Sequence, residues 1–180
     1  MRVISGSAKG RKLKTPRGMD VRPTADSVKE AVFNIIREAV IGCRVLDLFA
    51  GSGQLGIEAL SRGAKEAVFV DVSATSLKLV KDNLMLCGFN GKTVREDALD
   101  YLQHAEPFDL IFIDPPYDSD YYEKVLEKIK LFDILTDGGI MIVETRRNKE
   151  LPDIGCPFKM LKEYEYGSVK ISTYTKEALS

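Results

Sequence analysis

The sequence contains only one histidine, His104, and only three cysteines, Cys43, Cys87 and Cys156, which lie far apart. No pair of cysteines has the spacing of metal ligands, and one histidine cannot supply the several imidazoles of a common zinc site. A catalytic triad built around histidine would also need partners that the sequence does not set beside His104. We therefore expect neither a metal site nor histidine-based nucleophilic catalysis.

Long hydrophobic runs are also missing. No apolar stretch is long enough to cross a bilayer, and residues 1–6 contain no apolar core of signal-peptide length. The composition, with 44% hydrophobic and 29% charged residues, is typical of a globular protein, and 180 residues suffice for one well-packed domain with a small appendage. A cytoplasmic location and a monomeric state are the default expectations.

Charge is distributed unevenly, although the formal net charge is only −1. Residues 1–22 contain seven basic residues and a single acidic one, Asp20, so the remainder of the chain is acidic. A basic arm on an acidic body suggests a polyanionic partner, and the alternative is a solvated terminal tail. The candidate phosphate-binding residues are Arg2, Lys9, Arg11, Lys12, Lys14 and Arg22.

The most informative stretch begins with residues 108–113, an almost unbroken apolar run rich in β-branched and aromatic residues. It predicts a strand at the centre of a parallel sheet that is covered on both faces. Asp114 follows, and then Pro115 and Pro116 remove two backbone donors and fix two φ angles. With Tyr117 they predict a stiff loop that presents a carboxylate, carbonyl groups and an aromatic ring at the ligand-binding edge of the sheet. An ordinary turn is the alternative, since Asp and Pro are common turn residues.

Strands and helices are predicted to alternate around this run. A helix with one apolar face is expected over residues 28–39. It follows the basic arm, for which a small β-hairpin or a mobile segment would both fit and the hairpin is preferred. The expected strands are residues 44–49, 66–71, 92–96, 108–113 and 140–144, followed by an antiparallel pair, 158–166 and 168–174, and a turn is expected at 137–139. This order predicts a three-layer α/β/α, doubly wound, mostly parallel seven-stranded sheet. The predicted division is an arm, residues 1–22, and one domain, residues 23–180.

A glycine-rich turn is expected where the first strand passes into the following helix. Gly51, Gly53 and Gly56 match the pattern G-x-G-x-x-G, and Asp71 ends the second strand twenty residues after Gly51. Glycines at such a turn let the backbone approach a ligand, and the acid is placed for ribose hydroxyls, as in dinucleotide-binding folds. A glycine-rich turn with no ligand is the alternative interpretation.

Acidic residues at the same edge favour one type of cofactor over another. Asp47 precedes the glycines, where it would repel a pyrophosphate but attract a ligand that carries an ammonium and a sulfonium. Asp97 ends the third strand and could accept a hydrogen bond from an adenine amino group. Asp47, Asp71, Asp97 and Asp114 thus end successive strands or nearly do so, which suits a cationic ligand.

At this point the sequence resembles class I S-adenosylmethionine-dependent methyltransferases, which have a Rossmann-like fold, and within them the RsmD family of 16S rRNA (guanine-N2)-methyltransferases. The resemblance covers nearly all of the chain. It rests on the segments 2–6 with 10–13, 22–35, 47–53 and 114–117. The family usually has leucine or alanine at the positions of Gln54 and Leu55, and a more basic segment than residues 6–8.

The resemblance implies S-adenosylmethionine as the cofactor and 16S ribosomal RNA as the partner, with the arm and the block that begins at Arg22 helping to position the RNA. A domain this small needs help to recognise a folded target, so we expect an assembled or partly assembled small subunit as the substrate. By position, the implied cofactor-binding residues are Asp47, Phe49, Gly51, Ser52, Gly53, Asp71, Val72, Asp97, Ala98 and Asp114. The residues implied to hold the target base are Asp114, Pro115, Pro116 and Tyr117.

Other functions stay open at the level of sequence. A nicotinamide-dependent dehydrogenase shares the glycine pattern, but its usual catalytic base is missing and Asp47 is unfavourable. A DNA adenine-N6 or protein-glutamine methyltransferase would use the same Asp-Pro-Pro-Tyr motif on another planar amine or amide. A non-catalytic RNA-binding module would need only the basic arm and would leave that motif unexplained.

Overall fold

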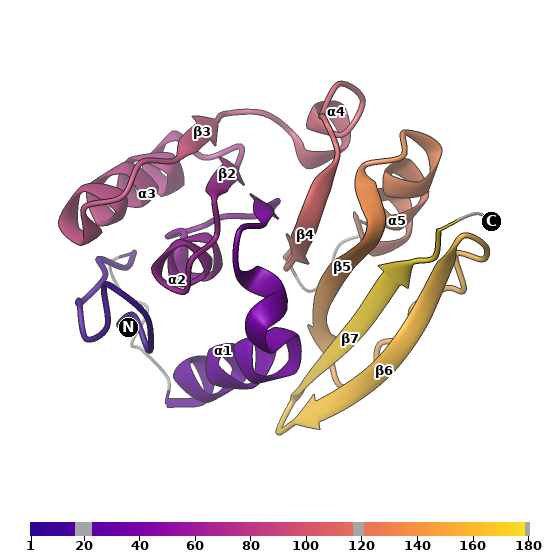
Figure 1. Cartoon of the computed structure of the whole chain (residues 1–180), viewed down its shortest axis with the longest axis horizontal. Coiled ribbons are helices and arrows are strands. Elements are labelled where there is room, and N and C mark those ends of the chain that lie inside the picture. The colour runs from indigo at the N-terminus through magenta and orange to yellow at the C-terminus, as the bar shows by residue number, and fades with distance from the viewer. Residues whose placement is uncertain (17–22, 117–120, 179–180) are drawn as a thin grey trace.

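The computed structural model describes residues 1–16, 23–116 and 121–178. Its strands are β1 (Arg44–Asp47), β2 (Glu66–Val70), β3 (Lys92–Val94), β4 (Phe108–Ile113), β5 (Leu135–Arg146), β6 (Phe158–Tyr166) and β7 (Val169–Lys176). They form one seven-stranded sheet in the order β3-β2-β1-β4-β5-β7-β6 (Figure 1). Strands β1 to β5 pair in parallel, and β7 runs antiparallel to both β5 and β6. The predicted mostly parallel, doubly wound sheet is therefore confirmed.

Helices cover both faces of the sheet. They are α1 (Pro23–Ile36), the 3-10 helix η1 (Arg37–Val40), α2 (Gln54–Ser61), α3 (Ala74–Cys87), α4 (Ala98–Tyr101) and α5 (Tyr121–Leu131). Helices α1, α2 and α3 lie on one face, and α4 and α5 lie on the other (Figure 1). In the part of the chain that the structure describes, no helix combines the length and the hydropathy needed to cross a membrane.

Alternation along the central strands explains this three-layer arrangement. Val45 and Leu110 point into the core beneath α1, α2 and α3, whereas their neighbours Leu46 and Ile111 point into the core beneath α4 and α5. All four are almost completely buried. A strand that is apolar on both faces buries both of them only when helices cover the two sides of the sheet. The unbroken apolar run predicted this arrangement.

Strand β5 differs from the sequence prediction, because it begins at Leu135 and not at Ile140. Leu135 is fully buried and pairs with Phe108 at the start of β4. The turn expected at residues 137–139 lies within the strand, where the register with β4 shifts and Gly138 has a φ of 75°. Residues 137–139 do interrupt the regular pairing, as a turn would. Burial of Leu135 nevertheless extends the strand on the N-terminal side of this interruption.

The N-terminal arm is a compact loop and not a two-stranded hairpin. Its only β-pairing among the described residues is the isolated antiparallel bridge between Arg2 and Lys12. Val3, Ala8 and Leu13 are buried in the same core as α1 and α2, so apolar anchoring holds the arm in place of a ladder of strand hydrogen bonds. Gly6 approaches α2 so closely that an added Cβ would lie 1.8 Å from the carbonyl oxygen of Ser61. The division into an arm and a domain stays a prediction.

A buried carboxylate joins the arm to both neighbouring helices. Glu58 of α2 is completely buried, and its oxygens accept the backbone N–H groups of Ile4 at 2.8 Å and Ser5 at 3.0 Å. The ammonium of Lys29 in α1 lies 3.6 Å from Glu58 and donates to the carbonyl of Arg2 at 2.5 Å. Burial lowers the pKa of Lys29, and the nearby Glu58 opposes that change. One carboxylate thus fixes three segments that are distant in sequence.

We predict that Glu58→Gln destabilises the protein by about 3 kcal/mol or more, because the buried Lys29 loses its nearest countercharge and Arg62 loses an ion-pair partner at 2.9 Å. The amide would also turn a donor toward the N–H groups that now share the carboxylate. Urea unfolding followed by circular dichroism measures the change, and Glu127→Gln on the exposed side of α5 serves as the control. A loss of less than about 1 kcal/mol would show that Glu58 is not a structural anchor.

Candidate active site

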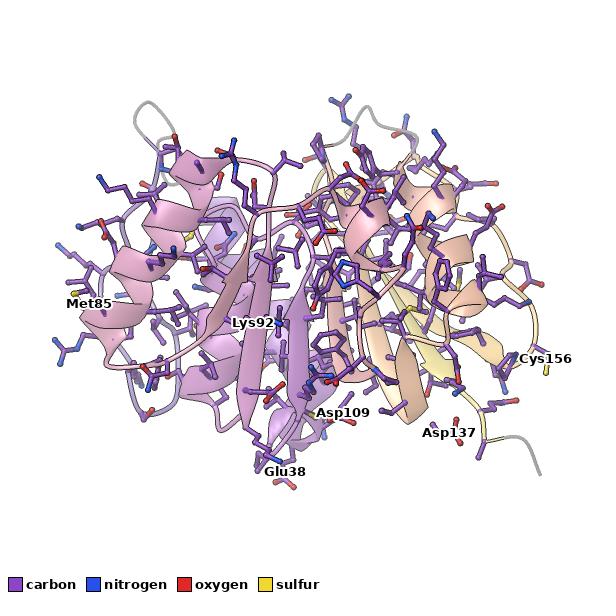
Figure 2. All side chains as sticks on the ribbon, turned by 90° about the horizontal axis from the view of Figure 1, so that it is seen from above. Glu38, Met85, Lys92, Asp109, Asp137 and Cys156 are labelled. Carbon is purple, nitrogen blue, oxygen red and sulfur yellow. The ribbon has the colours of Figure 1, made fainter. Side chains whose placement is uncertain are left out.

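Four aspartates lie at the carboxyl edge of the parallel strands, as the sequence predicted. Asp47 is the last residue of β1, Asp71 follows β2 directly, Asp97 lies just beyond β3, and Asp114 follows β4 directly. Asp109, in contrast, lies near the opposite edge with Glu38 and Asp137 (Figure 2). There it accepts the backbone N–H of Arg44 at 2.8 Å and the hydroxyl of Thr136 at 2.9 Å. The four aspartates of the candidate site therefore lie at the opposite end of the strands from Asp109, whose hydrogen bonds are structural.

The glycine-rich turn between β1 and α2 has the backbone form that a close ligand requires. Gly51 and Gly53 have φ angles of 53° and 77°, and Gly53 is the N-cap of α2. A Cβ added to Gly51 would meet nothing within 4 Å, so the turn is open to an approaching group there. Gly56 has a different role, because a Cβ at this position would lie 2.3 Å from the ring of Phe69. It lets α2 pack tightly on β2.

Asp71 holds this turn through both of its carboxylate oxygens. One oxygen accepts the N–H of Gly51 at 2.9 Å, and the other accepts the N–H of Ser73 at 2.8 Å. Each oxygen keeps a further lone pair that can accept from a ligand hydroxyl. The neighbouring Val72 is 59% exposed at the same corner. Asp71 therefore both shapes the turn and offers acceptors beside it.

Asp47 is a carboxyl group in an apolar position. It is only 3% exposed, and it accepts the N–H of Gly56 at 3.0 Å. Burial raises its pKa to about 7, and the charge of Asp71 acts in the same direction, whereas the hydrogen bond from Gly56 opposes the rise. A positive charge placed beside Asp47 would stabilise the ionised form.

Asp97 and two aromatic rings form the far end of the site. Asp97 caps α4 by accepting the N–H of Leu99 at 2.8 Å, and its other oxygen accepts the hydroxyl of Tyr121 at 2.5 Å. This hydrogen bond, with burial, raises the pKa of Tyr121. The ring of Tyr121 meets Phe49 edge to face at 5.6 Å, and Ala98 is buried beside Asp97. Tyr121 was not identified from the sequence, although an aromatic residue next to the proline loop was an available signal.

Asp114 is half-buried, between a buried strand and the exposed Pro116. Burial raises its pKa well above the ordinary range, and the charges of Glu144 and Asp47 raise it further. Pro115 is buried, which fixes the corner after the carboxylate. Two residues singled out in the sequence, Tyr117 and Arg22, lie outside the described residues.

A cleft of about 800 Å³ opens beside Asp114. Its walls come from α1, the start of α2, the end of β5 and the segment that joins β6 to β7. Glu144, Gln54 and Lys29 line it together with Asp114. The side-chain oxygen of Gln54 is buried and has no hydrogen-bond partner among the described residues. The sequence did not identify Glu144 or Gln54 as site residues, although an acid that ends a buried parallel strand is itself a signal.

The basic arm is connected to the glycine-rich turn through one side chain. Asn83 of α3 is completely buried; its oxygen accepts the N–H of Lys14 at 2.7 Å, and its amide nitrogen donates to the carbonyls of Lys14 at 3.0 Å and Ser52 at 2.9 Å. The ammonium of Lys14 itself pairs with Asp82 at 2.8 Å. Four other basic residues of the arm are exposed and make no ion pair within the described ranges: Arg2, Lys9, Arg11 and Lys12.

Comparison with known proteins gives consistent matches over the whole chain. A family model described as conserved hypothetical protein 95 matches residues 1–175. The putative rRNA methyltransferase YlbH of Bacillus subtilis is 41% identical over 98% of this chain and 99% of that protein. The ribosomal RNA small subunit methyltransferase D of Escherichia coli is 33% identical over 99% and 91%, respectively. The solved structure of a putative methyltransferase, yhhF from Escherichia coli, has a TM-score of 0.89 and 32% identity, with 99% of each chain covered.

The raised pKa of Asp47 gives a prediction about stability. The folded protein holds the Asp47 proton up to about pH 7, whereas the unfolded chain releases it near its ordinary value, so this residue lowers the free energy of unfolding as pH rises between those limits. Asp47→Asn keeps an acceptor for Gly56 and removes the titration. We expect the variant to gain stability relative to the native protein from pH 5 to pH 8, by at most about 4 kcal/mol.

Urea unfolding at several pH values measures this difference. Glu127→Gln, at an exposed carboxylate of α5 away from the site, corrects for the general effect of removing one charge. Parallel curves for Asp47→Asn and the native protein would contradict the assignment of a raised pKa to Asp47.

Proposed function

The chain belongs to the conserved hypothetical protein 95 family, which is the RsmD family, and from this premise we propose that it transfers a methyl group from S-adenosylmethionine to the N2 amine of a guanine in small-subunit ribosomal RNA. The observation that carries the proposal is the position of Asp114. Its carboxylate lies at the carboxyl end of β4, in front of two prolines, in a cleft that is also lined by Gln54, the residue after the glycine-rich turn. The names of the bacterial relatives support the class of substrate.

The residues at the carboxyl edge fit S-adenosylmethionine. Its sulfonium supplies an electrophilic methyl group and its own leaving group. Asp47 and the open side of Gly51 suit the charged methionine end, and Asp71 with Val72 suits the ribose. Asp97 and Ala98 suit the adenine. Among these groups, Asp47 gains most from a cation, since burial otherwise holds it partly protonated.

Asp114 and the prolines address the weakness of the nucleophile. The lone pair of a guanine N2 amine is delocalised into the ring, so it needs acceptors that hold its hydrogens and aim the lone pair at the methyl carbon. Asp114 and the carbonyl oxygen of Pro115 or Pro116 are such acceptors, and Tyr117 stacks on the base. A target base in a duplex must be unstacked to reach this position.

The raised pKa of Asp114 also suits proton transfer. Once the amine carries the methyl group it must lose one hydrogen as a proton. A carboxylate whose pKa lies well above the ordinary range is a stronger base than a surface aspartate and can receive it. No metal or covalent intermediate is required for these steps.

The arm supports recognition of RNA. Its exposed basic residues include Lys9, Arg11 and Lys12, and they lie on a segment that Asn83 joins to the glycine-rich turn. Contacts between these residues and phosphates would therefore be made next to the cofactor-binding residues. This surface is small for a folded RNA target. We therefore expect an assembled or partly assembled small subunit as the substrate, a monomeric enzyme and a cytoplasmic location.

The function is tested by mapping methylated nucleotides in ribosomal RNA from cells with and without the gene. We expect one N2-methylguanine in the small-subunit RNA to disappear on deletion and to return with the native gene, but not with Asp114→Ala. In vitro, this variant should lose at least about 100-fold in turnover, since it removes both an acceptor and a base.

Binding of S-adenosylhomocysteine, followed by calorimetry, separates a role in catalysis from a role in cofactor binding. Its dissociation constant should change little in Asp114→Ala, and Asp109→Ala at the opposite edge is a poor control because it breaks two hydrogen bonds. Asp153→Ala, in an exposed loop, is preferable. Native turnover in Asp114→Ala would exclude the proposed role.

The arm should contribute to the salt dependence of RNA binding. Replacing Lys9, Arg11 and Lys12 by glutamine removes three exposed charges, which is expected to reduce the slope of log K against log salt by about 2. Lys14→Gln should have a smaller effect, because Asp82 already neutralises Lys14. Filter binding from low to high salt measures the slope.

A triple variant in which glutamine replaces Lys65, Lys92 and Lys162 matches the loss of charge at exposed positions outside the arm. If both triple variants change the slope equally, general electrostatics would explain the effect. An unchanged slope in the arm variant would contradict direct contact between the arm and phosphates.

A further inference from the structure

Two carboxylates stand side by side at the mouth of the candidate active site. Strands β4 and β5 run in parallel register, with Ile113 opposite Val143. The next residues, Asp114 and Glu144, are therefore abreast on adjacent strands, whose backbones in a sheet lie about 4.8 Å apart. Both line the cleft of about 800 Å³. The resemblance used above assigns a role to Asp114 and none to Glu144.

We propose that Glu144 determines which base is accepted, by receiving the N1–H of guanine while Asp114 receives the N2 amine. This inference rests on the proposed function and specifies its substrate. A flipped base is read along its Watson–Crick edge, where guanine has two adjacent donor groups, one hydrogen at N1 and two at N2. A pair of carboxylates is complementary to that pattern.

The same pair is unfavourable for the other amino-bearing bases. Adenine has its amine next to N1, and cytosine has its amine next to N3, and in both bases that ring nitrogen is an acceptor. An ionised Glu144 facing such a nitrogen would oppose lone pair to lone pair, which is repulsive. Sites built to bind a donor reject analogues that lack it strongly. The cleft thus argues against the adenine-N6 alternative.

A third acceptor in the cleft supports the same ligand. The side-chain oxygen of Gln54, at the start of α2, is buried and lacks a donor among the described residues. A buried acceptor is normally satisfied, so this one points to a donor supplied by a ligand. Glu144 and Asp114 thus accept the N1 hydrogen and one N2 hydrogen, and Gln54 is an alternative to the proline carbonyls as acceptor for the second N2 hydrogen.

The electrostatics of Asp114 agree with the side-by-side positions of Asp114 and Glu144 on β4 and β5. Glu144 is the first charged neighbour that raises the pKa of Asp114, ahead of Asp47. Donor groups placed between the two carboxylates would relieve their repulsion, whereas an acceptor would add to it. Guanine would therefore lower the repulsion between Asp114 and Glu144, whereas adenine would not.

The test compares guanine with 2-aminopurine at the mapped target position of a small-subunit RNA. 2-Aminopurine keeps the N2 amine but has an unprotonated N1, which Glu144 cannot bind. The native enzyme should prefer guanine by about 100-fold or more in kcat/KM. Glu144→Gln should lower methylation of guanine by at least about 10-fold and reduce the preference below about 10-fold, because an amide can donate to N1.

Comparing the preference between variants cancels the difference in intrinsic reactivity of the two amines. Glu150→Gln, at an exposed position just after β5, is the matched control and should keep the native preference. Binding of S-adenosylhomocysteine should be native-like in both variants. If Glu144→Gln fails to fold, Glu144→Asp provides the test, since a retained carboxylate should keep the preference at a reduced rate.

The outcomes separate the two proposals. If the native enzyme forms no N2-methylguanine, the proposed function fails. If it forms N2-methylguanine and Glu144→Gln keeps the native preference for guanine over 2-aminopurine, or Glu144→Asp loses it, the role of Glu144 is wrong although the function stands.

Discussion

The confinement of several carboxylates, partly out of reach of water, at one edge of the sheet is the constraint on which the site depends. Asp47 on β1 and Asp114 after β4 are held near each other and near Glu144 on β5, at positions that exclude much of the water. Parallel strands impose this, because their carboxyl ends meet at a single edge. The folded chain therefore holds Asp47 and Asp114 with raised pKa values in the absence of a ligand. A bound cation or a set of hydrogen-bond donors would stabilise the ionised form of these carboxylates, which the fold disfavours.

A second set of buried polar contacts keeps that edge in a fixed relation to the arm. Glu58 receives the arm's N–H groups from one side, and Asn83 binds the backbone of Lys14 and the carbonyl of Ser52 from the other. Both side chains are fully buried, so loss of either leaves unsatisfied groups in the core. The basic residues of the arm and the glycine-rich turn are thereby parts of one packed unit.

Local signals explain which features could be predicted from the sequence. The apolar run at residues 108–113 and the glycine-rich turn at Gly51 and Gly53 each depend on neighbours within a few residues, and both appear in the structure as predicted. The positions of the four aspartates followed from the strand ends. Features that depend on distant partners were missed: the early start of β5 depends on Phe108, the shape of the arm on Glu58, and the importance of Glu144 on its register with Asp114. Sequence order does not contain these pairings.

One electrostatic feature accounts for the two proposed binding preferences. A row of acids repels polyphosphates and attracts a sulfonium, which explains the choice of cofactor. Asp114 and Glu144 lie on the adjacent strands β4 and β5. Together they attract two neighbouring N–H donors and repel a ring nitrogen that is an acceptor, which explains the proposed preference for guanine. A single carboxylate would bind any exocyclic amine. Two carboxylates on adjacent strands also distinguish whether the ring nitrogen next to that amine carries a hydrogen. Selectivity for guanine then needs no further recognition domain, because it arises where the reaction itself takes place.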